Sequence, residues 1–500
     1  MSSTIVQEHE AAPARPVRSG RHANTTLVVL FLSLGGLSFA LLQSLVAPAL
    51  PAISTDLQAS VTDISWVMTA YLLSASVLTP ILARLGDMQG KRKMMLVVLV
   101  LLAAGTVLAG LATSLPVLVA GRVLQGAAGA ILPLSIGIVR DELPKERVSV
   151  TVGMLSAISG IGAGLGIVLA GPIVDNLSWE WLFWLPLVLV AAALVGVAFG
   201  VPESPVRTPG RLDIVGTLVL SVSLISLLLA ISKGRAWGWD SGQTLGMFAV
   251  GIVGLVAFVL VELRVREPLI DMRLLARRGV WPANAVGLAF GFLMFGTFLV
   301  VPTLLEMPES TGYGFGRTIT QAGLFLLPTT LMLIVFGPVA GILVRKYGAK
   351  LPMVLGTVAG TAAYALPALA HDQLWHILAS GVLSGAAIGL VFASMSNAII
   401  AAVPATHTGQ ATSVNAIVRT VGGSIGTAVV AAVIASGTTA QDIPSDHSFT
   451  LGFAVCAAVG VLAIAAALAM PGRIVRRQDP TVDEPVGEPV DAPGTAVAGH

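Results

Sequence analysis

The stretch Ala83-Arg-Leu-Gly-Asp-Met-Gln-Gly-Lys-Arg92 is short, charged and rich in glycine, and it separates two long apolar runs at 62–82 and 94–113. Each run has roughly the 20 residues that a helix needs to cross the hydrocarbon core of a bilayer. Because lipid offers no hydrogen bonds to backbone groups, apolar runs of this length are helical inside it. The stretch therefore predicts a tight, charged loop between two transmembrane helices.

The rest of the chain repeats this pattern. Twelve further apolar runs are predicted as spans, at 27–50, 117–139, 150–174, 181–201, 213–232, 244–262, 281–305, 320–343, 351–370, 374–401, 411–436 and 449–470. Composition agrees, because 55% of the 500 residues are hydrophobic and 11% are charged, against roughly 25% charged residues in a soluble domain. The expected fold is an all-α integral membrane protein with fourteen transmembrane helices.

The positive charges predict the orientation of these spans. Loops on the cytoplasmic side of a membrane carry an excess of Lys and Arg. With both termini in the cytoplasm, only Lys233, Arg235 and Arg317 of the 28 Lys and Arg residues fall in outer loops. Arg122 and Arg419 fall inside spans, and all the others lie on the inner side. We therefore expect a multi-pass protein of the cell (plasma) membrane with both termini cytoplasmic.

An internal repeat predicts the domain organisation. The stretch 83–92 resembles Gly341-Ile-Leu-Val-Arg-Lys-Tyr-Gly-Ala-Lys350, and Val123-Leu-Gln-Gly-Ala-Ala128 resembles Val382-Leu-Ser-Gly-Ala-Ala387, at offsets of 258 and 259 residues. The related segments are eight spans apart, so two extra helices must lie between two six-helix halves. The predicted parts are a disordered cytoplasmic tail at 1–26, an N-terminal half at 27–201, a linker with two extra helices at 202–278, a C-terminal half at 279–471 and a second disordered tail at 472–500. Repeats that meet around a central cavity are typical of alternating-access transporters.

With these motifs, the chain resembles the fourteen-span drug:proton antiporters of the major facilitator superfamily over roughly 27–470. Leu85-Gly-Asp-Met-Gln-Gly-Lys-Arg92 resembles the cytoplasmic motif between helices two and three, and Arg122-Val-Leu-Gln-Gly126 resembles the helix-four motif. The glycines Gly160, Gly162, Gly164, Gly166 and Gly171, followed by Pro172, resemble the helix-five motif of exporters. The resemblance implies a major facilitator fold and proton-driven export of hydrophobic drugs or antibiotics by alternating access.

Three positions depart from the pattern of that branch. Ala83 replaces the first glycine of the cytoplasmic motif, and Ile167 follows Gly166 where Gly-Pro is usual. In the first helix, Leu42 occupies the place where the branch often carries an Asp. The resemblance therefore implies that this proton or cation site is absent.

The charged loop is predicted to act as a latch on the cytoplasmic side, formed by Gly86, Asp87, Gly90, Lys91, Arg92 and Asp141. Lys91 lies one turn after Asp87 and is close enough to pair with it, and Asp141 at the inner end of span four is a further partner. The resemblance implies that Asp87 also faces the N-terminal end of span thirteen, where the helix dipole favours a carboxylate. The alternative is that the basic residues only fix the topology.

Four polar residues are candidates for a proton or substrate relay. A charge inside a span is costly and normally faces the bundle interior with a partner, so Arg122 either contacts protons or substrate or bonds carbonyls of a neighbouring helix. Gln125, one turn on, shares its face. Arg419 is nearer the cytoplasmic end of span thirteen, where snorkelling is an equal alternative. Glu306 at the outer end of span nine, beside Glu309, is either partly buried or part of a solvated loop.

Two apolar features leave alternatives open. The glycines of span five, with Gly162, Gly164, Gly166, Gly171 and Pro172 at their centre, form a face for close helix packing, a hinge specific to export, or both. Phe290, Phe292, Phe295 and Phe298 either line a site for apolar drugs or face lipid, and the pattern favours lipid.

Other function classes find little support. The chain has no Gly-x-x-x-x-Gly-Lys-Ser/Thr loop for ATP and no His-Glu-x-x-His for zinc, so an enzyme is not expected. The single cysteine, Cys456, excludes an internal disulfide, and the net charge of +2 does not indicate nucleic acid. We expect no cofactor and no metal, and a monomer whose partners are a small hydrophobic substrate, protons and the bilayer. The alternative is an importer or metabolite carrier of the same superfamily.

Overall fold

The computed structural model describes residues 25–204, 206, 207, 210, 212–265, 267–437 and 443–472. In this part of the chain fourteen helices are long and apolar enough to cross a membrane, and no strand is present. The predicted fold class and number of spans are therefore confirmed. The two predicted tails lie outside the described residues, apart from a few residues at their inner ends.

The first six membrane-length helices fall between Thr25 and Gly200, and short helices join some of them. Their bounds are α1 (Thr25–Ser44), α2 (Val46–Asp56), α3 (Val61–Ile64), α4 (Trp66–Gln89), α5 (Lys91–Gly110), α6 (Leu115–Gln125), the 3₁₀ helix η1 (Gly126–Ala130), α7 (Ile131–Glu142), α8 (Lys145–Asn176) and α9 (Trp181–Gly200). The fourth span is thus two α-helices joined by the 3₁₀ segment η1, whose residues are all Gly or Ala.

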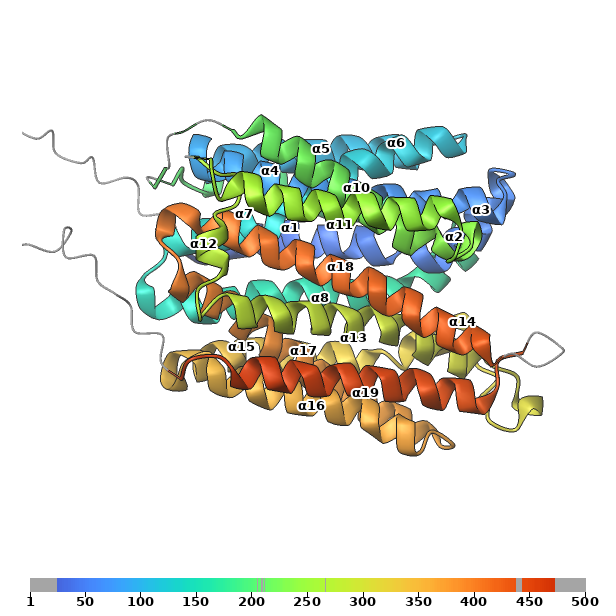
Figure 1. The fold of residues 1–500 in the computed structure, drawn as a ribbon. Helices are drawn as coiled ribbons and strands as arrows, with labels where there is room; N and C mark the ends of the chain where they lie inside the picture. The colour runs from blue at the N-terminus through green and yellow to red at the C-terminus, as the bar shows by residue number, and fades with distance from the viewer. Residues whose placement is uncertain are drawn as a thin grey trace, which may run out of the picture.

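The remaining eight spans begin with the two extra helices. Their bounds are α10 (Ile214–Trp237), α11 (Gly242–Glu262), α12 (Met272–Leu275), α13 (Trp281–Glu306), η2 (Glu309–Thr311), α14 (Ile319–Leu324), α15 (Leu327–Tyr347), α16 (Lys350–Leu369), α17 (Leu374–Ala402), η3 (Ala405–His407), α18 (Thr408–Ser436) and α19 (Asp446–Leu468). Successive spans alternate in direction, so α1 begins and α19 ends at the same end of the bundle (Figure 1). We call this the terminal end.

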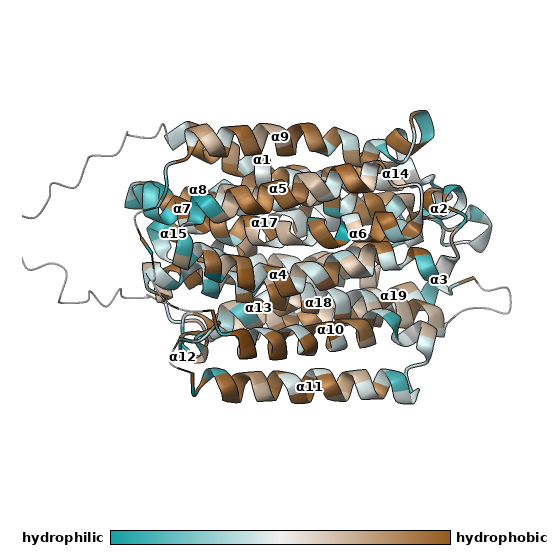
Figure 2. Cartoon of the chain, turned by 90° about the horizontal axis from the view of Figure 1, so that it is seen from above, coloured by the Kyte–Doolittle hydropathy of each residue, from teal (hydrophilic) through white to brown (hydrophobic). Residues whose placement is uncertain are grey.

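The apolar core is divided in the same way as the sequence repeat. One cluster of buried side chains comes from residues 28–201 together with Ile400, and a second comes from 274–470 together with Ala157. Hydrophobic residues run along the helices, and hydrophilic residues gather mainly at the two ends (Figure 2). The division of the chain into two halves and a linker remains a prediction, with which these clusters agree.

The helix α10 lies beside α4 and α18. A third apolar cluster joins Leu220 and Leu224 of α10 to Val414 and Ile417 of α18. On the other side of α10, the hydroxyls of Ser232 and Thr69 of α4 are 3.0 Å apart. α11 packs on α10 at the edge of the bundle and is the least buried of the fourteen spans (Figure 2). The helix α10 therefore covers the line along which α4 and α18 meet, and α11 covers α10.

The two halves approach each other most closely where α8 runs antiparallel to α14 and α15. Glycines permit this approach over the whole length of α8, since a Cβ at Gly153 would lie 2.7 Å from the Gly337 carbonyl oxygen and one at Gly160 2.8 Å from Leu333. A Cβ at Gly164 would overlap Thr330, and one at Gly171 would lie 2.7 Å from Thr320. Small residues at such interfaces let helix backbones come together in lipid.

Two further glycines of the same motif point to a different neighbour. A Cβ at Gly162 would lie 2.6 Å from Ala40 of α1, and one at Gly166 would overlap the hydroxyl of Ser44. The Ser44 hydroxyl donates to the Gly162 carbonyl at 3.2 Å. Pro172 lies inside α8, which continues to Asn176. The glycine-rich motif therefore packs α8 against α1 on one face and against α14 and α15 on the other.

Substitution of Gly341, on the α15 side of this contact, tests its importance for stability. In Gly341→Ala the new Cβ would lie 2.6 Å from the Cα of Val150, a backbone atom that cannot rotate away. We expect the overpacking to lower the free energy of unfolding by about 1–3 kcal/mol. The purified protein should therefore have a lower Tm. Gly36→Ala is the matched control, because no atom lies within 4 Å of its Cβ position. An equal Tm for the two variants would contradict the close contact.

Candidate functional site: a central cavity and the contacts that close one end of it

A cavity of about 70 Å³ lies between the two halves. Its walls come from α1, α4, α7 and α8 of the first half and from α13, α17 and α18 of the second. The lining combines aromatic rings with polar groups, among them Phe39, Gln43, Tyr71, Phe295, Phe392 and Arg419. Its residues include no Asp and no Glu. A cavity lined mainly by apolar groups with a few polar ones is the common form of a small-molecule site.

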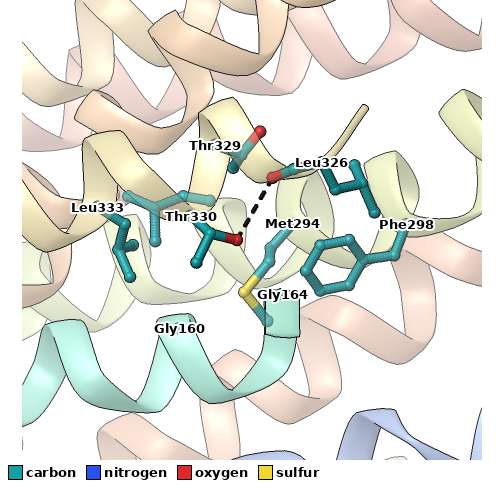
Figure 3. A pocket seen from close by; sticks show the side chains of 9 residues that line it. Gly160, Gly164, Met294, Phe298, Leu326, Thr329, Thr330 and Leu333 are labelled. Carbon is teal, nitrogen blue, oxygen red and sulfur yellow. Dashed lines mark hydrogen bonds between the residues drawn. The ribbon is translucent and has the colours of Figure 1, made fainter. Parts of the chain in front are cut away.

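A smaller, apolar pocket of about 20 Å³ adjoins this cavity. Gly160 and Met294 line both spaces. Figure 3 shows the pocket between α8, α13 and α15, with Phe298 and Leu333 on its wall and the Thr330 hydroxyl bonded to the Leu326 carbonyl. Apart from the hydroxyls of Thr329 and Thr330, the side chains that line the pocket are apolar, and the remaining lining residues are glycines.

The four phenylalanines of α13 do not face lipid, so the favoured interpretation of them was wrong. Phe290 and Phe292 are buried in the core of the second half. Phe295 lines the central cavity and Phe298 the side pocket, with their rings 6.3 Å apart. The spacing of these phenylalanines along α13 does not indicate which side of the helix faces the first half of the protein.

Arg419 lies in the wall of the central cavity and does not snorkel to the membrane surface. Its guanidinium is 4.8 Å from the ring centroid of Phe392 on α17, a cation–π contact. Within the described residues, no hydrogen bond or ion pair reaches this guanidinium. Arg419 is therefore a charged group that the protein itself leaves available.

Arg122 is placed very differently, because it is fully buried in the first half and does not line the cavity. It donates to the carbonyls of Val67 and Leu42 at 3.2 and 3.0 Å and to the Gln125 side chain at 2.8 Å. Gln125 in turn donates to the Thr106 hydroxyl at 3.1 Å. This geometry favours the alternative in which Arg122 bonds carbonyls of neighbouring helices.

The position where the resembling branch often carries an acid lies next to this arginine. Leu42 has a buried aliphatic side chain, and its carbonyl oxygen accepts a bond from Arg122. The Tyr71 ring covers the other side, with its centroid 4.2 Å from the Arg122 guanidinium carbon. Arg122 thus joins α1, α4 and α6 without an acidic partner.

Asp87 lies between the halves, as the latch prediction requires. Its carboxylate accepts a hydrogen bond from the backbone N–H of Gln410 in the first turn of α18, at 3.2 Å. A Cβ at Gly409 would lie 2.7 Å from the same carboxylate, so glycine allows the approach. Both the free N–H groups and the dipole of a helix N-terminus favour an anion there.

Lys91 connects Asp87 to Asp141, and its side chain is almost completely buried. Its Nζ donates to Asp141 at 2.5 Å and is 3.9 Å from Asp87. The Ser204 hydroxyl donates to the same carboxylate oxygen of Asp141. Gly86 allows this packing, because a Cβ there would overlap Leu134. The three charges therefore form one buried network at the terminal end of α4, α5 and α7.

Arg140 makes the most direct polar connection between the halves, and the sequence gave it only a role in topology. From α7 it donates to the carbonyls of Val403 and Pro404, at 2.8 and 3.2 Å, and to the Thr408 hydroxyl at 2.5 Å. All three acceptors precede or begin α18. Their carbonyls are backbone groups without a sequence signature, which is why pattern analysis did not find this contact.

Glu203 is a second residue that sequence reasoning missed. Its carboxylate accepts hydrogen bonds from the N–H groups of Arg92 and Lys93 in the first turn of α5. Gly90 has φ +121°, and a Cβ there would lie 2.6 Å from Glu203. Arg92 bonds the carbonyls of Val197 and Ala198 near the end of α9. The loop is thereby tied to the segment that follows α9.

Glu306 does not join any of these groups. Its side chain is exposed at the end of α13, as is that of Glu309, and neither lines the central cavity. The solvated-loop alternative describes both positions. In the described part of the chain, no cluster of three His, Cys, Asp or Glu residues is arranged to hold a metal.

Sequence comparison places this chain among known transporters. The family model described as "Major Facilitator Superfamily" matches residues 32–427 and 286–492. The "Tetracenomycin C resistance and export protein" of Streptomyces glaucescens is 30% identical over 87% of this chain and 80% of its own length. "Multidrug transporter protein MdtP" of Bacillus subtilis is 28% identical over 83% of this chain and 76% of its own length.

Two solved structures share the fold. The human organic anion transporter MFSD10 (TETRAN) matches with a TM-score of 0.60 at 16% identity, over 89% of this chain and 99% of its own. The proton:xylose symporter XylE matches with a TM-score of 0.60 at 15% identity, over 88% and 94% of the two chains. At these identities the likeness concerns the fold alone.

Arg122→Ala tests whether this arginine supports the structure. The change leaves buried oxygens of Leu42, Val67 and Gln125 without their hydrogen-bond donor. Each unsatisfied buried group lowers the stability of the fold by about 1–3 kcal/mol. We expect less folded protein in the membrane and a lower Tm. Arg345→Ala is the control, since Arg345 is exposed on α15. A normal Tm together with lost transport would instead favour the relay role.

Proposed function

Because this chain belongs to the Major Facilitator Superfamily, we propose that it exports hydrophobic drugs or antibiotics across the cell membrane by alternating access. The observation that carries the proposal is its similarity, over more than four fifths of the chain, to proteins named for multidrug transport and for tetracenomycin C resistance and export. The aromatic cavity between the halves and its apolar side pocket are suited to such compounds.

The driving force in this proposal is proton antiport. The lining of the central cavity has no carboxylate, and Leu42 replaces the acid of the first helix. The proton therefore has to be carried elsewhere. Asp87 and Asp141, both buried beside Lys91, are the described carboxylates whose burial and position between moving parts suit that task.

In the same proposal the terminal end is cytoplasmic and the structure represents the outward-open state. Asp87 with Gln410, and Arg140 with Val403, Pro404 and Thr408, join the halves at the terminal end. Farther along the same helices, Tyr71–Thr79 of α4 and Ala416–Thr420 of α18 line the cavity. A latch on the inner side and a cavity beyond it are what an outward-open exporter requires.

A panel of drug susceptibilities tests the export function. The gene is expressed in a bacterial host that lacks its own major efflux pumps, beside an empty vector. We expect raised resistance to several unrelated hydrophobic compounds, or to one compound if the protein is a dedicated self-resistance exporter. Unchanged susceptibility at normal membrane levels would contradict export, and increased accumulation of a compound would favour the importer.

Asp87→Asn tests the latch. A charge-assisted hydrogen bond contributes about 1.5–3 kcal/mol, so its loss shifts the balance between the two states by roughly an order of magnitude or more. We expect normal membrane insertion, at least about tenfold lower export, and faster maleimide labelling of a cysteine placed at the buried position Ala411, in a chain that also carries Cys456→Ala.

The matched control for that variant is Asp240→Asn, which makes the same chemical change at an exposed position between α10 and α11. It should leave both export and labelling unchanged. Asp87→Asn with normal export would show that the loop at 86–93 only anchors the topology.

A further inference from the structure

The two arginines inside the membrane-length helices are satisfied in opposite ways. A charge within a span is rare and nearly always has a partner. Arg122 has its partners in the protein, namely the carbonyls of Leu42 and Val67 and the amide of Gln125. Arg419 lines the central cavity, and the interaction found for its guanidinium among the described residues is the cation–π contact with Phe392. The partner of Arg419 is therefore to be sought among molecules that enter the cavity.

Among the described residues, no acid lines the cavity to serve as that partner. The residues that line the cavity include neither Asp nor Glu, and the carboxylates of Asp87 and Asp141 are engaged with Lys91 and its neighbours at the terminal end. The cavity wall consequently carries a positive charge that nothing in the described protein neutralises.

The hydroxyls of the cavity cannot act as donors to a ligand in its place. Each of Ser76, Thr79 and Ser159 donates its proton to a carbonyl four residues earlier in its own helix, and Thr420 does the same. A hydroxyl has one O–H, so these groups present only lone pairs to the cavity. The side chains with hydrogen-bond donors left are Arg419 and Gln43, together with Tyr71, whose buried hydroxyl has no partner in the described chain.

The geometry of Arg419 suits a planar or tetrahedral oxyanion. A guanidinium offers five N–H donors in a fixed plane, which match a carboxylate or sulfonate in pairs. The Phe392 ring contacts the guanidinium, and no hydrogen bond from the described residues reaches its N–H groups. The rings of Phe39 and Phe295 on other walls of the same cavity provide surfaces for an aromatic body.

We propose that the central cavity binds organic anions, aromatic molecules that carry one carboxylate or sulfonate, with Arg419 as the counter-ion. This inference rests on the proposed export function and narrows its substrates to one class. The negative group lies against Arg419 between α17 and α18, and the apolar body extends past Met294 toward the side pocket. Cationic drugs are disfavoured, because the cavity has a fixed positive charge and no carboxylate.

Two dyes with the same carbon skeleton test the proposal. Anilinonaphthalene sulfonate carries the anion, and phenylnaphthylamine is its uncharged parent. Binding is measured on the full-length protein in lipid nanodiscs, with empty nanodiscs subtracted, and export is measured in everted membrane vesicles. We expect the wild-type protein to bind and export the sulfonate.

Substitutions of Arg419 identify the group responsible. Arg419→Gln should weaken binding of the sulfonate at least about tenfold more than binding of the parent dye, as loss of a charge-assisted bond requires. Arg419→Lys should recover part of the loss, since it keeps the charge without the fork. Arg345→Gln removes the same charge from an exposed position on α15 and should change the binding of neither dye. The Tm of each variant shows whether it is folded.

The outcomes distinguish a failure of the anion-site proposal from a failure of the proposed export function. If Arg419→Gln weakened the binding of both dyes equally, or left the binding of the sulfonate unchanged, the counter-ion role would be overturned. Export of the parent dye without export of the sulfonate would overturn the anion class and leave the exporter standing. Export of neither dye by the wild-type protein would contradict both proposals.

Discussion

The close antiparallel contact of α8 with α14 and α15 is the constraint on which the arrangement of the two halves depends. In lipid there is no hydrophobic force between apolar helices, so they associate through close packing and a few polar bonds. Here glycines supply the packing, since Gly153, Gly164 and Gly341 leave no room for a Cβ. Gly162 and Gly166 pack the other face of α8 against α1. One helix therefore holds a wall of the first half and the boundary with the second.

The corresponding boundary between α4 and α18 is built from charge instead of close packing along its length. Asp87 accepts from the first turn of α18, and Arg140 of α7 donates to the segment that enters it. Such bonds are strong because each includes a charged group, yet few groups have to separate for the end to open. A boundary packed by glycine along one side and held by separable charges on the other is suited to a rocking motion. The helix α10 packs on α4 and α18 at this boundary.

The two intramembrane arginines show how context gives one residue type two roles. Arg122 is enclosed by α1, α4 and α6, where carbonyls and the Tyr71 ring take up its guanidinium. Arg419 lines a cavity between the halves, where its guanidinium contacts the Phe392 ring. For Arg122, hydrogen bonds within the protein offset the free-energy cost of burying a charge. For Arg419, a bound anion would offset that cost, which is the basis of the proposed anion site.

The sequence by itself predicted the fourteen spans, which the structure confirms. It also predicted an offset repeat, two extra helices between two halves, and the pairing of Lys91 with Asp87 and Asp141. These follow from local periodicity, from charge and from contacts between residues that are near in sequence or share a motif. Only the tertiary structure decided that Arg419 faces the cavity, that Arg122 does not, and that the phenylalanines of α13 face inward. Hydrophobic spans look alike on every side in lipid, because the solvent and the core are both apolar. The side of a helix that meets its partner is therefore fixed by packing between distant segments, and no pattern within one span records it.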